Sequence, residues 1–186
     1  RCIFDVELGP KSLGFNAYAD GEEIVIGPKL MELVTDDNQL AFIIAHEFSH
    51  NILNHQQSSQ INRVNGAMLG ALADIALGAA LGTSSGGGTF SDVGTTAGDL
   101  SYSADFEKEA DYLGLYLLAM ANYSLDKAPH VWRKFAAIDP DSLYSRTTHP
   151  TSPERFVMMR KTIEQIRAKR LNKQLLHPNV ISQDNS

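Results

Sequence analysis

The chain contains a short run, His46-Glu47-Phe48-Ser49-His50, that combines two metal-binding imidazoles with a carboxylate. The residues before it, 38–45, have helical character, and residues four apart on a helix lie one above the other. His46 and His50 would therefore project from one face and could share one zinc ion. Glu47 would lie beside the metal, where its carboxylate can take a proton from a zinc-bound water.

A catalytic zinc site usually has three protein ligands and one open position for water. The best candidate for the third ligand is Glu107, which lies in a run (residues 106–118) whose apolar residues recur at helical spacing. Asp111 is one turn further along and could accept the free ring N–H of His46, which would set the tautomer of that ring. The alternative for Glu107, Glu109 and Asp111 is an acidic first turn that the helix dipole favours.

These motifs resemble those of the HtpX/BepA-type zinc metallopeptidases, a gluzincin family that includes the CAAX prenyl endoprotease and the Oma-type proteases. Family members carry HExxH, then Glu-x-x-Ala-Asp, then His-Pro followed by an arginine. The corresponding residues here are 46–50, 107–111, His149-Pro150 and Arg155. An upstream family signature, Asn-Ala-aromatic-Ala, is matched by Asn16, Ala17, Tyr18 and Ala19. The resemblance covers roughly residues 15–159 and implies one zinc per chain, with Arg155 supporting the ligands.

His149 has two open roles at such a site. It could stabilise the oxyanion of the transition state, or it could occupy the open position of the zinc ion and keep the protein latent, which the resemblance favours. The strand around Asn16, Ala17, Tyr18 and Ala19 could pair with an extended substrate by β-augmentation. Such pairing would select unfolded chain rather than a particular side-chain sequence.

Composition limits the remaining possibilities. The 186 residues are enough for one domain with a hydrophobic core, and the net charge of −6 argues against nonspecific nucleic-acid binding. A single cysteine, Cys2, excludes an internal disulfide and does not indicate a compartment. We expect residues 1–186 to form a single catalytic domain of the α+β class. By resemblance, the domain is mainly helical and zincin-like, with a small N-terminal β-sheet and an HExxH helix.

Several elements must position these residues. Residues 3–26 contain short β-rich runs broken by glycines, and a short helix should follow Pro28. Asp36, Asp37 or Asn38 can cap the active-site helix, which we expect to run to about residue 55, and Ser152-Pro153 should start the last helix. Trp132 and Phe135 are expected in the core. The three histidines that we expect at the surface rather than at the metal are His55, His130 and His177.

The segment 65–82 is rich in Ala, Gly and Leu, with glycines spaced in fours. A membrane span is one interpretation, but Asp74 within the segment favours a buried or interfacial helix hairpin. A Gly/Ser-rich segment at about 82–98 is expected to be flexible and to gate the cleft, and the tail at about 175–186 is expected to be frayed. The basic last helix could rest on anionic lipid, although a solvated face is favoured, so peripheral membrane association stays open.

The function that these observations favour is a zinc-dependent endopeptidase acting on proteins or peptides. By resemblance, its substrates would be misfolded or misassembled cell-envelope proteins, and it would lie in the bacterial cell envelope, in the periplasm. The alternative is a zinc-stabilised chaperone or binding module without proteolytic turnover. Glu47 argues against that alternative, because a structural zinc needs no carboxylate beside its first ligand.

Overall fold

The structure is a computed structural model that describes residues 4–81, 89–138, 149 and 152–179. Most of these residues are helical, and a small sheet lies at the N-terminal end, so the expected α+β class is confirmed. The elements in chain order are β1 (Asp5–Leu8), η1 (Lys11–Leu13), β2 (Ala17–Ala19), β3 (Glu23–Ile26), α1 (Pro28–Leu33), α2 (Asp37–Ile52), α3 (His55–Leu81), α4 (Thr89–Met120), η2 (Leu125–Lys127), α5 (Ala128–Ile138) and α6 (Pro153–Leu171).

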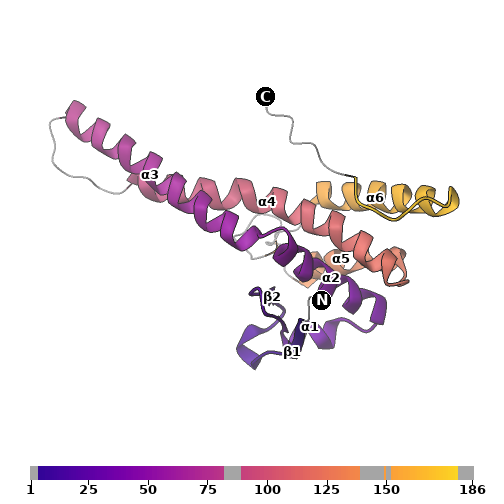
Figure 1. The fold of residues 1–186 in the computed structure, drawn as a ribbon. Helices are drawn as coiled ribbons and strands as arrows, with labels where there is room; N and C mark the ends of the chain where they lie inside the picture. The colour runs from indigo at the N-terminus through magenta and orange to yellow at the C-terminus, as the bar shows by residue number, and fades with distance from the viewer. Residues whose placement is uncertain (1–3, 82–88, 139–148, 150–151, 180–186) are drawn as a thin grey trace.

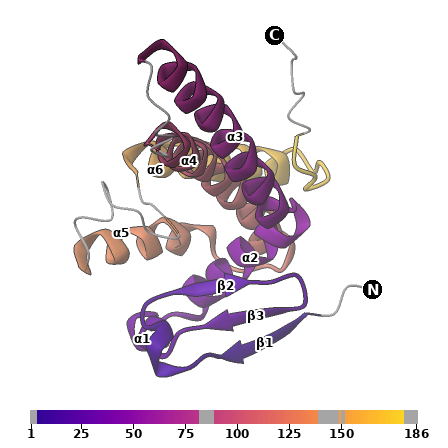
Figure 2. The ribbon, with the colours of Figure 1, turned by 90° about the vertical axis from the view of Figure 1, so that its left-hand side faces the viewer.

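Three short strands form the sheet, in the order β1-β3-β2 (Figure 2). The strand β3 pairs in parallel with β1 and in antiparallel with β2, so β2 is an edge strand. At Gly27, where the sheet ends, a Cβ atom would lie 2.3 Å from the carbonyl oxygen of Gly14. Only glycine allows this close approach, and Pro28 then starts α1 with the fixed φ that suits a first helical residue.

The helix α2 carries HExxH and lies between the sheet and α4. Asp36 caps its start by accepting a hydrogen bond from the backbone N–H of Asn38 at 2.8 Å, as expected for one of the three proposed caps. The helix ends at Ile52, because the chain turns at Asn54 with a φ of 53°. The expectation that α2 runs to about residue 55 was therefore wrong, and His55 is the first residue of α3.

The helices α3 and α4 form a long hairpin that extends away from the rest of the molecule (Figure 1). Residues 65–81 belong to the single helix α3 and form only one arm of this hairpin, and the side chains of α3 are largely exposed rather than buried, which corrects the expected buried hairpin at 65–82. Because α4 begins at Thr89, residues 89–98 are helical, which corrects the expected flexible segment 82–98. Its first part, 82–88, lies outside the described residues. Among the described residues, no helix combines the length and the apolar character needed to cross a membrane.

The core forms where α4, α5 and α6 meet α2 and the sheet. Trp132 is buried within it and Phe135 is partly buried, as expected. Ser152 caps α6 by accepting from the backbone N–H of Arg155, which confirms the predicted helix start. The tail was expected to be frayed from residue 175, yet the Asn179 N–H donates to the Tyr112 hydroxyl at 2.9 Å, so its first residues lie against α4.

Candidate metal centre

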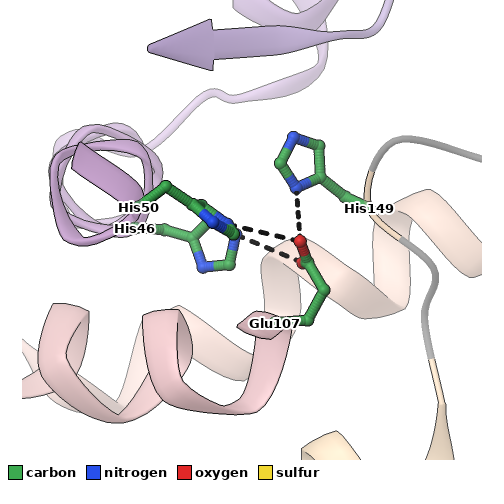
Figure 3. Close-up of side chains that lie close together, drawn as sticks. All are labelled: His46, His50, Glu107 and His149. Atoms are coloured by element: carbon green, nitrogen blue, oxygen red, sulfur yellow. Dashed lines mark hydrogen bonds and ion pairs between the residues drawn. The ribbon is translucent and has the colours of Figure 1, made fainter. Parts of the chain in front are cut away.

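Four side chains converge between α2, α4 and the segment before α6. His46 and His50 come from α2, Glu107 from α4, and His149 from the segment that precedes α6 (Figure 3). One potential ligand atom from each residue lies within 4.8 Å of those of the other three. The structure therefore brings together the three predicted ligands and the histidine whose role was open.

The distances fit a zinc ion. Four-coordinate zinc holds nitrogen and oxygen ligands at about 2.0–2.2 Å, which places neighbouring ligand atoms of a tetrahedron about 3.3 Å apart. The Nε2 atoms of His46 and His50 are 3.2 Å apart. His46 Nε2 lies 3.3 Å from Glu107 Oε2, and His50 Nε2 lies 3.3 Å from Glu107 Oε1. His149 Nδ1 is 3.1 Å from Glu107 Oε1, so a fourth ligand of the same kind is within reach.

Behind the ligands lies a buried set of polar contacts centred on Asp111. Asp111 Oδ1 is 3.1 Å from His46 Nδ1, the ring atom that faces away from the cluster, as the sequence predicted. Arg155 approaches Asp111 Oδ2 through Nε at 2.7 Å and Glu107 Oε2 through a terminal nitrogen at 2.8 Å. Trp132 donates from Nε1 to Asp111 Oδ1 at 3.0 Å. The sequence predicted Trp132 only as core, and its hydrogen bond depends on how α5 packs.

These contacts keep the buried carboxylates ionised. Burial alone would raise the pKa of Glu107, but His149, Arg155 and His46 outweigh it and hold the pKa well below its usual range. Burial likewise raises the pKa of Asp111, and Arg155 with His46 lowers it by more. An ionised Glu107 is the form that binds a metal cation.

Glu47 and His149 face each other across the site. Glu47 is buried, and its Oε1 lies 3.4 Å from His149 Nε2. His149 Nε2 is also 3.3 Å from the carbonyl oxygen of Ala17 on β2. Burial would lower the pKa of His149, but Glu107 and Glu47 raise it to about 9. Its ring therefore joins the carboxylates of the centre to the edge strand.

His55 was expected at the surface, and this expectation was wrong. The side chain is only 4% exposed and lies behind His50, with the two Nδ1 atoms 2.9 Å apart. Its Nε2 lies 3.1 Å from Glu109 Oε2, and its ring stacks on Phe106. Burial and then the neighbouring His50 lower the pKa of His55 to about 4. His130 and His177 are exposed, as expected.

A cleft with a volume of about 330 Å³ lies in front of the cluster. Its walls include Glu47, His50, Glu107 and His149, together with the three residues of β2. Asn16 and Asp20 use their backbones to pair with β3, through Asn16 O and Asp20 N–H. The alternate residues Ala17 and Ala19 therefore direct their backbone groups away from β3. In agreement, the Ala17 carbonyl faces His149 and the Ala19 carbonyl accepts from Gln56 of α3.

Comparison with known proteins agrees with this geometry. The family model for peptidase family M48 matches residues 4–163, which is most of the chain. The chain belongs to this family. Zinc is the metal of M48 peptidases, and the donor set of the four clustered residues suits it. The resemblance inferred from HExxH, the downstream glutamate and the His-Pro pair is thus confirmed.

Relatives that the chain matches include bacterial and fungal proteases. The chain is 28% identical over 165 residues to the Beta-barrel assembly-enhancing protease of Escherichia coli K12, covering 82% of this chain and 33% of that protein. It is 26% identical over 156 residues to the Mitochondrial metalloendopeptidase OMA1 of Saccharomyces cerevisiae, covering 78% of this chain and 43% of that protein. The chain therefore spans between a third and a half of the length of these relatives.

Proposed function

We propose that residues 1–186 act as one catalytic unit, a zinc-dependent endopeptidase. The observation that carries the proposal is the position of Glu47, whose buried side chain lines the same cleft as His50 and Glu107, two of the residues whose ligand atoms converge with that of His46. A carboxylate beside a zinc site is what hydrolysis needs and what a purely structural site does not. Membership of the M48 family and the protease names of its relatives support the same conclusion.

The mechanism assigns each residue a task. Zinc held by His46, His50 and Glu107 would supply Lewis acidity, which acidifies a water molecule and polarises the carbonyl of the scissile peptide. Glu47 accepts the proton of the attacking water and later returns it to the leaving amine. Asp111 and Arg155 keep His46 and Glu107 in place through the short contacts behind them.

The edge strand β2 is the proposed substrate platform. An extended peptide that adds a strand to β2 would use the backbone groups of Ala17 and Ala19, which face the cleft. Asn16 and Tyr18 alternate with them, and their part is to hold the pairing with β3 and to flank the substrate. Recognition through backbone groups favours unfolded or misfolded chain over a defined sequence.

In the proposed latent state, His149 connects the edge strand β2 to the metal centre. Its Nε2 lies at the Ala17 carbonyl, while its Nδ1 lies at Glu107 among the ligands. A substrate strand that pairs with Ala17 competes for the same carbonyl, so binding would draw the imidazole away from the metal centre. Substrate pairing would thereby open the fourth position of the zinc site.

The names of the relatives guide the proposed substrates and location. The bacterial relative is named for β-barrel assembly, and the fungal relatives are named as mitochondrial. We take the first as the guide and propose misfolded or misassembled proteins of the bacterial cell envelope as substrates, with the protein in the periplasm. Partners would be protein or peptide chains and not nucleic acid, since the net charge of the chain is −6.

One observation favours a second function. Because His149 lies within ligand distance of the other three residues, the site can close with four protein ligands, as a structural zinc site does. A protein permanently in that state would be a zinc-stabilised binding or chaperone module without turnover. Glu47, buried and facing the cleft, would have no task in it.

Casein cleavage with measurement of bound zinc tests the two functions. The peptidase should hold about one zinc per chain, cut casein, lose cleavage with a chelator and regain it when zinc is restored. A protein that holds zinc and suppresses aggregation of unfolded casein, but never cuts it, even after replacement of His149 by alanine, would show the second function instead.

A further inference from the structure

The outer face of α3 carries an exposed apolar stripe. Its members follow one another at intervals of three and four residues, which places them on one side of the helix. The stripe consists of Ile61 (52% exposed), Val64 (63%), Met68 (62%), Leu72 (58%) and Ile75 (67%). In a helix that packs in water, residues of this kind face the protein core.

The side of α3 that is less exposed carries the opposite kind of residue. The principal neighbour of α3 is α4, and the residues on the less exposed side are Ser59, Asn62, Ala67, Gly70, Ala71 and Asp74. The packed side of α3 thus carries small and polar residues, with bulky apolar side chains outside. Helices in lipid have this arrangement, because close packing of small residues joins the helices while large apolar residues face the acyl chains.

The distribution of charge around the stripe favours lipid over a second copy of the protein as its binding partner. Between Val64 and Leu77, α3 has a single charged residue, Asp74, which lies on the less exposed side. Leu69 and Ala76, which lie beside the stripe on the helix surface, are uncharged as well. Interfaces between helices in water usually have a charged or polar rim, whereas the exposed polar residues beside this stripe, Gln60 and Asn65, lie near its start. The hairpin also extends away from the rest of the molecule (Figure 1), and the side chains of the stripe are more than half exposed.

We propose that the stripe of α3, Ile61 to Ile75, contacts the hydrocarbon region of a lipid bilayer. The contact would hold the cleft close to a membrane surface, since α3 begins with His55 and Gln56 in the wall of the cleft. The binding would be driven by apolar burial rather than by charge. It should therefore occur on neutral lipid and depend little on salt.

Flotation with vesicles of neutral phosphatidylcholine tests the proposal. The triple variant Met68→Gln, Leu72→Gln, Ile75→Gln changes only exposed positions, and its binding at limiting lipid should fall by roughly tenfold or more. The matched control Val157→Gln, Leu171→Gln, Leu175→Gln changes three other exposed apolar residues, each more than half exposed, and should float like the parent. Absence of flotation by the parent, or equal flotation of the stripe variant, overturns the proposal. So does a parent dimer in sedimentation that the stripe variant converts to monomer without any vesicle binding.

A second inference comes from the contacts of His55 and rests on the proposed zinc site. If His50 binds the metal through Nε2, its Nδ1 carries the proton and donates to His55 Nδ1 at 2.9 Å. His55 must then carry its own proton on Nε2, which faces Glu109 Oε2 at 3.1 Å. Each donor in this series of hydrogen bonds meets an acceptor, and the series ends at the carboxylate of Glu109.

We infer that His55 is a positioning residue for the zinc ligand His50, with Glu109 as its anchor. Phe106 stacks on the His55 ring at 4.3 Å between ring centres and limits its rotation. The orientation of His50 is thus set from α3 and α4, as that of His46 is set by Asp111 of α4. Partners of this kind typically change metal affinity by about 10–100-fold when they are removed.

Zinc affinity measured by competition with a chelator tests this role without using peptidase activity. His55→Phe keeps the stacked ring but loses both hydrogen bonds, so zinc affinity should fall by about 10–100-fold, and His55→Gln should recover part of it. The control His130→Phe, at an exposed position of α5, should bind zinc like the parent. Nitrogen NMR of the zinc-loaded protein should show His55 protonated at Nε2.

The inference is overturned if His55→Phe binds zinc as tightly as the parent, or if the zinc-loaded protein has His55 protonated at Nδ1. It is also overturned if the melting temperature of the metal-free variant falls while its zinc affinity does not. A parent that binds zinc but cuts no casein contradicts the proposed function and leaves this affinity test intact.

Discussion

Gly114 of α4 lies against the backbone of His46 of α2, so closely that a Cβ atom on it would be 3.3 Å from both the Cα and N atoms of His46. The absence of a side chain lets α2 and α4, which carry the proposed zinc ligands, approach each other at the level of the candidate metal centre. Gly114→Val should therefore push α4 away from α2 and destabilise the protein by about 1–3 kcal/mol. Zinc affinity should fall as well, because Glu107 moves with α4.

Urea unfolding of the metal-free protein and chelator competition measure the two effects of Gly114→Val. Ala168→Val, at an exposed position of α6, controls for the lower helix propensity of valine and should change stability by less than about 1 kcal/mol. A Gly114→Val protein with the stability and zinc affinity of the parent would show that this close approach is not required.

Glu107→Gln tests the third ligand. Loss of the carboxylate should lower zinc affinity by more than the 10–100-fold typical of a residue behind the ligands. Asp105→Asn, an exposed position on the same helix, should leave affinity unchanged. Full zinc occupancy of Glu107→Gln under chelator competition would place the third ligand elsewhere, with Glu109 and Asp111 as the next candidates.

Glu47→Gln tests the proton carrier. The variant should fold and hold zinc, because Glu47 is not one of the four residues whose ligand atoms converge. Its casein turnover should fall by about 10²–10⁴-fold. Glu164→Gln on the exposed face of α6 is the matched control. Turnover near that of the parent would contradict the mechanism, even if zinc is required for activity.

His149→Ala separates the two roles of this histidine, because the roles predict changes of opposite sign. Removal of an imidazole that fills the fourth zinc position should raise casein turnover, and this is the outcome we expect. Removal of an oxyanion donor should lower it by about 10²–10³-fold with zinc affinity unchanged. Unchanged turnover would remove His149 from the site, and His177→Ala, at an exposed position, controls for loss of a histidine.

Arg155→Met leaves two buried carboxylates, Glu107 and Asp111, without their shared guanidinium. The metal-free variant should lose about 3–5 kcal/mol of unfolding free energy, since Arg155 is only 2% exposed. Arg167→Met on the same helix removes an exposed pair with Asp126 and should cost less than about 1 kcal/mol. Equal effects of the two substitutions would show that Arg155 does not stabilise the buried carboxylates.

The local parts of the site could be predicted because they depend on contacts within one helix. His46 and His50 are four residues apart on α2, so helical geometry alone places their rings together. The caps at Asp36 and Ser152 are equally local, since each side chain accepts from a backbone N–H two or three residues away. The order of HExxH, the downstream glutamate and the His-Pro pair, together with the signature at residues 16–19, carried the resemblance to the family.

His55 shows where the same reasoning failed. The helical spacing of residues continues past Ile52, so this spacing does not show that the chain turns at Asn54 and starts a new helix. An asparagine at that point is a turn signal, because asparagine adopts positive φ more readily than most residues. The contact of His55 with Glu109 could not be predicted at all, since 54 residues separate the two.

The sequence by itself predicted the types of the proposed ligands, the helix that carries two of them and the carboxylate beside them. The tertiary structure decided which distant atoms meet: Arg155 with Asp111 across 44 residues, and His149 with the Ala17 carbonyl across 132. Such long-range contacts depend on the distance and rotation between packed helices. Core packing sets both, including the close approach at Gly114, and no local periodicity encodes them.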